Sequence, residues 1–261
     1  MYATERQNRI ADGIAARGRV SVVELSGDFG VTTETIRRDL AALEGVGVLR
    51  RVHGGAIAPK RASLVEPSLL ERSATGGAAK AAIAERALDA IGPRYRGAVM
   101  IDAGSTTGAF AQLLPAHIHG SDAHLDVVTH AIPIAHALSD VAGIALTVVG
   151  GQVRGLTAAA VGSSTVKVLE GLRTDLAFVG VNGLSADFGL STPDTGEAAV
   201  KSAIVHGARQ VIVLADASKF GAESLVRFGR LDDIDILVTD AAPDAALARS
   251  LDEAQVEVWL A

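Results

Sequence analysis

The stretch VTTETIRRDL, residues 31–40, has the clearest helical pattern in the chain. Three apolar residues within and just after it fall at i, i+4 and i+7, on one face of a helix: Ile36, Leu40 and Leu43. Thr32 suits the N-cap of this helix, because its hydroxyl can accept a hydrogen bond from the first turn. At about 100° per residue, a buried Ile36 turns Glu34 and Arg38 outward. The stretch therefore predicts a helix with one buried face and one polar face.

Two shorter helical patterns precede this stretch. Residues 5–17 carry two isoleucines four positions apart, which is the spacing of a short amphipathic helix. The sequence SVVE, residues 21–24, is a capping box in which the hydroxyl of Ser21 would accept from a first-turn amide. It opens a predicted helix over residues 25–29, and Gly30 ends that helix. The predicted order is helix, helix, short turn, helix.

The run LRRVHGGA, residues 49–56, follows these helices and predicts a short basic strand that ends in a glycine turn. Three helices and a basic ribbon are typical of a winged helix-turn-helix, in which one helix enters the DNA major groove and arginines contact phosphates. The alternative is a small helical dimerisation module whose arginines are only solvated. The candidate DNA-binding residues are Ser21, Thr32, Thr33, Glu34, Thr35, Arg37, Arg38, Arg50, Arg51 and His53.

Together, residues 31–40 and 49–56 resemble the N-terminal signature of the DeoR/GlpR family of bacterial transcription regulators. The resemblance implies that the recognition helix begins within residues 32–38 and that residues 50–55 form the wing. It also implies that the choice of operator depends on Thr33, Glu34 and Thr35, because residues 36–40 look common to the whole family.

Charge is divided unevenly along the 261 residues, whose net charge is −6. Residues 1–61 hold ten Lys and Arg against seven Asp and Glu, whereas residues 62–261 hold fourteen against twenty-three. This division predicts two modules with different partners. There is no cysteine, so disulfides and thiolate chemistry are excluded. The sequence also lacks a secretory h-region and any run of 18 apolar residues, so we expect a cytoplasmic protein without a membrane span.

From about residue 78, short apolar runs alternate with helical segments. Strands are predicted at residues 98–101, 127–129, 145–149, 176–181, 211–215, 236–239 and 256–259. Helices are predicted between them, at residues 78–91, 106–114, 132–139, 163–172, 195–206 and 244–251. This alternation predicts an α/β domain with a mainly parallel sheet. The expected organisation is a winged helix-turn-helix over 1–57, a linker over 58–77 that can include a short helix near Ser68, and an α/β domain over 78–261.

Polar clusters follow several of the predicted strands, where ligands bind in open α/β sheets. DAGSTT, residues 102–107, offers backbone amides and hydroxyls at a helix N-terminus, which suits a phosphate or is simply an N-cap. Glu197 and Lys201 lie on the helix that follows another of these clusters. Their i, i+4 spacing is also that of an ordinary surface ion pair. Lys219, in a loop after a strand, is the better cation for a phosphate.

These clusters resemble, in the same order, the effector domain of DeoR/GlpR regulators. The resemblance implies a fold like that of ribose-5-phosphate isomerase and a phosphorylated sugar or polyol as effector. The implied effector-binding residues are Asp102, Gly104, Ser105, Thr106, Thr107, His130, Gly151, Asn182, Gly183, Glu197, Lys201 and Lys219. One departure concerns His130, which stands where the family often has Asn. A histidine there can donate to an anion or simply pack.

The leading hypothesis is a sugar-phosphate-responsive repressor that binds double-stranded operator DNA as a homodimer or homotetramer. A fructose phosphate is the first candidate effector, with pentose and polyol phosphates left open. We expect no catalytic residue, no cofactor and no metal; His117, His119 and His124 are close in sequence, and an exposed insertion is favoured over metal capture there. The alternative is a sugar-phosphate isomerase in which Asp102, Asp216 or Glu197 is the general base.

Overall fold

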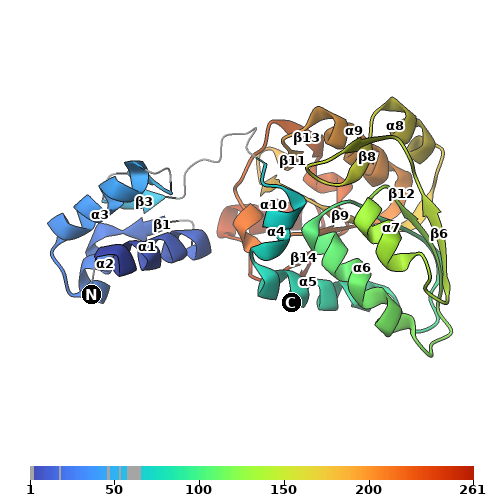
Figure 1. The fold of residues 1–261 in the computed structure, drawn as a ribbon, viewed down its shortest axis with the longest axis horizontal. Helices are drawn as coiled ribbons and strands as arrows, with labels where there is room; N and C mark the ends of the chain where they lie inside the picture. Colours follow the sequence, from blue (N-terminus) through green and yellow to red (C-terminus); the bar gives the residue numbers. More distant parts are fainter. Residues whose placement is uncertain (1–2, 18, 46–47, 53, 58–65) are drawn as a thin grey trace. The chain divides into compact units, whose positions relative to one another are not determined.

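The computed structural model describes residues 3–261 except 18, 46–47, 53 and 58–65. The chain folds as two compact units, Met1–Ala62 and Ser63–Ala261, each of which is treated separately below (Figure 1). The segment predicted as a linker, residues 58–77, is divided in the structure. Residues 58–65 lie outside the described part, and residues 66–77 belong to the second unit and include helix α4 (Leu69–Ala74).

The first unit contains the three predicted helices and a small antiparallel sheet of order β1-β3-β2. Its elements are α1 (Ala3–Arg17), β1 (Arg19–Ser21), α2 (Val22–Phe29), α3 (Thr33–Gly45), β2 (Arg50–Val52) and β3 (Gly55–Ile57). Ile10, Ile14, Leu25, Ile36 and Leu40 are all buried in its core. The apolar face predicted for residues 31–43 is therefore confirmed, and the predicted wing is the β2-β3 hairpin.

The two predicted N-caps have different outcomes. Thr32 caps α3, because the amide of Thr35 donates to its Oγ1 at 3.2 Å. The capping box at Ser21 was wrong: this residue precedes α2, but its side chain makes no capping hydrogen bond to the described residues. Ser21 is instead the last residue of β1, paired with Gly55, and the next amide donates to the carbonyl oxygen of Gly54 at 2.9 Å. The sheet thus satisfies one of the first-turn amides of α2, which have no partner within the helix.

A buried ion pair joins α1 to α3, and the hydrophobic pattern gave no sign of it. The guanidinium of Arg6 donates from Nε to Oδ2 of Asp39, and the amide of Gln7 donates to Oδ1 at 3.1 Å. Both charged side chains are less than a tenth exposed. The hydrogen bond to Asp39 raises the pKa of Arg6 and outweighs the opposing effect of desolvation. Removing one partner of such a pair leaves a buried charge without compensation.

The Arg6→Met substitution should therefore lower the unfolding free energy of the first unit by about 3–5 kcal/mol. Urea unfolding followed by far-UV circular dichroism measures the helices of both units. Trp259, the single tryptophan of the sequence, reports the second unit by fluorescence, and its transition should not move. Arg9→Met is the matched control, because the Arg9–Glu5 pair is exposed and should matter by less than about 0.5 kcal/mol. Equal effects of the two substitutions would contradict the prediction.

The second unit is built on a seven-stranded sheet of order β15-β14-β12-β9-β4-β5-β6, in which every pair is parallel. The strands are β4 (Arg96–Ile101), β5 (His124–Thr129), β6 (Ile144–Val148), β9 (Thr174–Gly180), β12 (Ala208–Leu214), β14 (Ile236–Thr239) and β15 (Glu257–Leu260). All seven strands expected from the sequence are in this sheet, so the predicted parallel α/β fold is confirmed.

Helices cover both faces of this sheet (Figure 1). The helices α5 (Gly77–Ala87), α6 (Ser105–Ile118) and α7 (Ile132–Leu138) share one hydrophobic cluster with the sheet. The helices α8 (Ser163–Glu170), α9 (Thr195–Gly207) and α10 (Ala245–Glu253) share the other. Side chains alternate between the two clusters along β9, with Leu176 and Phe178 on one face and Ala177 and Val179 on the other.

Short strands and turns beyond the main sheet complete the second unit. They are β7 (Gln152–Arg154) paired with β8 (Ala159–Val161), the antiparallel sheet of β10 (Gly183–Ser185), β11 (Gly189–Thr192) and β13 (Val226–Gly229), and the 3-10 turns η1 (Leu88–Ala90), η2 (Ala217–Lys219) and η3 (Leu231–Asp233). The sequence analysis did not predict these short strands, which lie in glycine-containing segments between the elements of the main sheet. None of the described helices is both long and apolar enough to cross a membrane.

Candidate functional site

The outward face of α3 is a candidate DNA-reading surface. The side chain of Arg38 is 81% exposed, and Glu34 forms exposed ion pairs with Arg37 and Arg38, each at 3.6 Å. Thr32 is exposed, and Thr33 and Thr35 are half-buried beside it. These side chains point away from the core, as the helical geometry of residues 31–40 requires.

The wing is fixed to α3 by a charged contact. The Nε of Arg51 donates to Oε2 of Glu44 at 2.6 Å, and the backbone amide of Arg51 donates to Oε1 at 2.9 Å. Arg51 remains half-exposed in this contact, which leaves its guanidinium open to a phosphate. Ser21 is half-buried at the end of β1. His53 and the side chain of Arg50, both predicted to bind DNA, lie outside the described part of the structure.

The Arg38→Ala substitution should weaken operator binding by about 1–3 kcal/mol, the value of a good contact to a base edge. It should leave the melting temperature unchanged, because the side chain is exposed and lies outside the core. The measurement is fluorescence anisotropy with a DNA fragment that the wild-type protein has selected from random sequence. Arg9→Ala on α1 is the control. Undiminished binding by the Arg38 variant would exclude this face of α3 as the reader.

The predicted site in the second unit is organised around Asp102, which directly follows β4. Its side chain is fully buried. Oδ2 accepts from the amide of Gly180 at 3.0 Å and from the ammonium of Lys201, which also donates to the carbonyl oxygen of Gly180 at 2.9 Å. The carboxylate therefore connects the ends of β4 and β9 to helix α9. Its role is to hold these ends together beneath the surface that a ligand would touch.

His130, which follows β5, joins the same buried centre. Its Nδ1 donates to the carbonyl oxygen of Ala160 at 2.8 Å, because a carbonyl only accepts. Its Nε2 lies 3.1 Å from Oδ1 of Asp102 and 3.3 Å from the amide nitrogen of Ala103. The imidazole is 97% buried and supports the loop after β4 from below. Of the two roles left open by the sequence, the structure shows an internal hydrogen-bonding one.

The charge state of Asp102 follows from these contacts. Burial alone would raise its pKa strongly, but the charge of Lys201 and the hydrogen bond from His130 more than compensate. The net result is a pKa below the ordinary value of 3.8. The carboxylate is therefore ionised in the folded chain. Its pairing stabilises the fold fully at pH values above the ordinary pKa of 3.8. This contribution is lost as the pH falls through the lowered pKa of the folded state.

Asp102→Asn should consequently destabilise the second unit at pH 7 and flatten its pH dependence below about pH 4. The expected loss at pH 7 is about 3–5 kcal/mol, because Lys201 becomes a buried cation without its counter-charge. Urea unfolding followed by Trp259 fluorescence between pH 2 and 7 measures both effects. Asp252→Asn, at an exposed position of α10, should change neither. An acid profile of the Asp102 variant parallel to that of the wild type would refute the assignment.

A polar pocket lies above this centre. Seven of the residues predicted to bind an effector line it: Gly104, Ser105, Thr106, Asn182, Glu197, Lys201 and Lys219. Gly104 is the N-cap residue of α6, and no described side chain caps this helix, so first-turn amides retain donor capacity. Glu197 is the only carboxylate in the lining. Parallel strands bring these residues together because their carboxyl ends share one edge of the sheet.

Other predicted residues lie away from the pocket surface. Thr107 is fully buried, and its Oγ1 has no hydrogen-bond partner among the described residues. Gly151 packs against Thr165, whose Oγ1 would lie 1.9 Å from an added Cβ. A Cβ added at Gly183 would similarly lie 2.3 Å from the carbonyl oxygen of Ala222. The close approach of other groups explains both glycines without a ligand.

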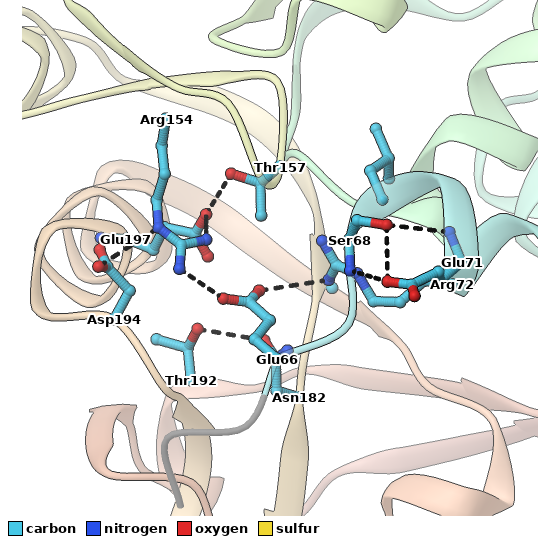
Figure 2. Close-up of polar contacts among 12 residues, drawn as sticks. Glu66, Ser68, Glu71, Arg72, Arg154, Thr157, Asn182, Thr192, Asp194 and Glu197 are labelled. Carbon is cyan, nitrogen blue, oxygen red and sulfur yellow. Dashed lines mark hydrogen bonds and ion pairs between the residues drawn. The ribbon is translucent and has the colours of Figure 1, made fainter.

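The surface-pair alternative for Glu197 and Lys201 was wrong. Both side chains are buried, and they bind different partners. Lys201 bonds to Asp102, whereas Glu197 accepts from the hydroxyl of Thr157 and from Arg154 at 3.2 Å (Figure 2). Helical spacing alone cannot distinguish such separate contacts from a mutual pair.

Three further lining residues, Arg72, Lys80 and Thr157, were not predicted. Arg72 lies in the segment predicted as a linker, Lys80 lies near the start of a predicted helix, and Thr157 lies in a turn. Lys80 is buried and donates to the carbonyl oxygens of Arg72 and Thr75 at the end of α4. Desolvation lowers the pKa of Lys80, partly opposed by the charge of Asp216. The available sequence signal was a pair of basic residues, Arg72 and Lys80, eight positions apart. Such pairs are too common to be specific.

Comparison with known proteins decides the family. Residues 6–62 match the model of a DeoR-like helix-turn-helix domain, and residues 76–241 match that of the DeoR C-terminal sensor domain. The chain belongs to the DeoR family of transcription regulators. It is 34% identical over 260 residues to a putative aga operon transcriptional repressor of Escherichia coli O157:H7, covering 98% of this chain and 93% of that protein.

Two other relatives are also named as repressors. The chain is 30% identical to the glycerol-3-phosphate regulon repressor of Escherichia coli K12, with full coverage of both proteins, and 33% identical to the repressor GlcR of Bacillus subtilis, covering 99% and 96%. Ribose 5-phosphate isomerase A from Methanocaldococcus jannaschii aligns with a TM-score of 0.40 and 17% identity, covering 54% of this chain and 53% of that structure.

Membership in this family makes the chain a DNA-binding regulator, and the isomerase alternative is not favoured. The three carboxylates that the isomerase alternative names as possible general bases are each bound to other groups of the chain. Asp102 holds Lys201, Glu197 holds Arg154, and Asp216 accepts from the amide and hydroxyl of Ser218. Among the described residues, no group of three or more His, Cys, Asp and Glu could bind a metal ion.

Proposed function

We propose that this DeoR-family regulator is a repressor whose affinity for its operator is changed by a phosphorylated sugar. One observation carries the choice of ligand: four basic side chains line the pocket at the strand ends, against a single carboxylate. They are Arg72, Lys80, Lys201 and Lys219. A dianionic phosphate suits a lining with four basic side chains, of which Lys201 is paired with the buried Asp102, and the open N-terminus of α6.

The room beside the polar pocket suits the rest of a sugar. A second pocket shares Lys80, Gly104, Ser105 and Thr157 with the first, and extends between helices α4 to α7. Its further lining combines small and apolar residues with two polar ones: Leu69, Ser73, Gly77, Ala81, Gly108, Ala109, Gln112, Ala131, Pro133 and Ile134. A charged half next to a roomier, mixed half is the layout expected for a ligand with one phosphate and a carbon skeleton.

The relatives support repression as the mode of action, since the three named above are all called repressors, one of them of the glycerol-3-phosphate regulon. We further infer a homodimer or homotetramer, because a helix-turn-helix reads one half-site and symmetry doubles the contacts. The site of action is the cytoplasm, where the DNA is. The effector would act through its different affinities for the DNA-bound and free states.

The test is a panel of ligands on the full chain: fructose 1-phosphate, fructose 6-phosphate, ribose 5-phosphate and glycerol 3-phosphate, each beside its unphosphorylated parent. At least one phosphorylated compound should raise the melting temperature, because a ligand at a hundred times its Kd adds about 2.7 kcal/mol. The same compound should weaken operator binding. Lys219→Ala should preserve operator binding but blunt this response. A panel that leaves stability and operator affinity unchanged would contradict the proposal.

A further inference from the structure

The main sheet ends at β6, and this edge is unprotected. Strand β6 has β5 on one side and no strand of the described residues on the other (Figure 1). Its sequence, IALTV, contains neither a charged residue nor a proline, which are common means of protecting an edge strand. The strand at the opposite edge, β15, carries the exposed Glu257. An edge without such protection is a template for another strand.

The outward backbone groups of β6 follow from its pairing with β5. Successive residues of a strand turn their N–H and C=O groups to opposite sides. The amide of Leu125 in β5 donates to the carbonyl oxygen of Gly143 at 3.0 Å, so the parallel register turns the odd-numbered residues of β6 toward β5. Leu146 and Val148 therefore turn their N–H and C=O groups away from the sheet, and no other described residue hydrogen-bonds to these groups. A row of free donors and acceptors is what an added strand binds.

The same edge of a second copy fits these groups. Two identical strands can pair antiparallel about a two-fold axis, because each presents the same pattern to the other. With the axis at Leu146, the two copies of this residue exchange both hydrogen bonds, and each Val148 amide donates to the carbonyl oxygen of Ile144 in the other copy. The amide of Ile144 needs no further partner, because it already donates to Val141 at 3.1 Å. Since β6 has no charged residue, the axis brings no like charges together.

The side chains of this edge favour the same occupant. Ile144 and Leu146 are half-buried and pack against the hydrophobic cluster that includes α7, whereas Val148 is 53% exposed. In the pairing about Leu146, the two Leu146 side chains are neighbours across the axis, and Val148 of one copy lies opposite Ile144 of the other. Apolar side chains on both copies are then removed from water, which favours association.

We propose that two copies of the chain associate through β6, so that their main sheets form one continuous sheet across a two-fold axis. The proposal rests on the proposed function in one respect, the homodimer, to which it assigns a surface. It does not depend on the effector. Strand β6 contributes no residue to the polar pocket or to the pocket beside it, so substitutions on this edge test the interface and leave the ligand site intact.

Disulfide trapping tests the register, because the full chain has no cysteine of its own. In the pairing about Leu146, Ala145 of one copy lies opposite Thr147 of the other, with Cα atoms about 4.5 Å apart, which a disulfide can span. Identical residues lie on a diagonal about 7–8 Å apart, which it cannot span without movement. Mixed Ala145→Cys and Thr147→Cys chains should therefore cross-link on mild oxidation several-fold more than either variant alone. Leu260→Cys, on β15, is the control and should cross-link with neither. No cross-link in the mixture, or equal yields from the single variants, would overturn the proposal.

Hydrogen exchange of the wild-type chain, resolved to single amides, tests the occupant without any substitution. The amides of Leu146 and Val148 should exchange at least about tenfold more slowly in the dimer than in the monomer obtained by dilution, as sedimentation defines the two. The amides of Ala145 and Thr147, which face β5, are the internal control and should be protected in both.

Two exchange results would overturn the interface. Fast exchange of Leu146 and Val148 in the dimer would show that the copies meet elsewhere, and protection that persists in the monomer would assign the edge to a segment of the same chain. A wild type that sediments as a monomer at every concentration would overturn the homodimer of the proposed function as well. The effector response is measured separately and is untouched by any of these results.

Discussion

The buried contact between Asp102 and Lys201 determines the geometry of the sensor site. A carboxylate without access to water is tolerable only when it is well paired, and here it accepts from an ammonium and a backbone amide and lies 3.1 Å from the imidazole Nε2 of His130. Those groups come from α9, the end of β9 and the residue after β5. The single carboxylate therefore fixes three neighbouring strand ends and one helix relative to each other. The loop that opens α6 lies directly on this support, and residues 103–106 of this loop and the first turn of α6 line the polar pocket.

The pairing of acidic groups also explains why the pocket is suited to an anion. Asp102 is below the surface, and Glu197, the carboxylate in the lining, is engaged by Arg154 and Thr157. Lys201 is paired with Asp102 and Arg72 lies 3.7 Å from Glu66, whereas Lys80 donates to backbone carbonyl oxygens. Lys80 and Arg72 come from the first segments of the second unit, and the other cations from α9 and from the 3-10 turn after β12. A ligand that binds all of them connects the start of the unit to its centre.

Sequence periodicity was sufficient to predict the strands of the main sheet. The residues that it missed or misassigned have physical explanations. Every strand of the main sheet was predicted, because buried parallel strands are continuous apolar runs. The pair Arg6 and Asp39 was missed because charged residues in a helix pattern are normally solvated. Ser21 was misassigned because a strand, formed with residues more than thirty positions away, took the place of a cap. Arg72 was hidden in a segment without periodicity, where only the fold reveals that it lines a pocket.

In the proposed regulator, one chain couples a DNA-reading helix to a phosphate-binding pocket. Thermodynamic linkage makes this coupling reciprocal: a ligand that weakens operator binding by a given factor must itself bind more weakly to the operator complex by the same factor. The most direct test is the affinity of the full chain for an active sugar phosphate, measured with and without saturating operator DNA. The account predicts two different affinities whose ratio equals the change in operator affinity. Identical affinities would show that the two units act independently and would contradict it.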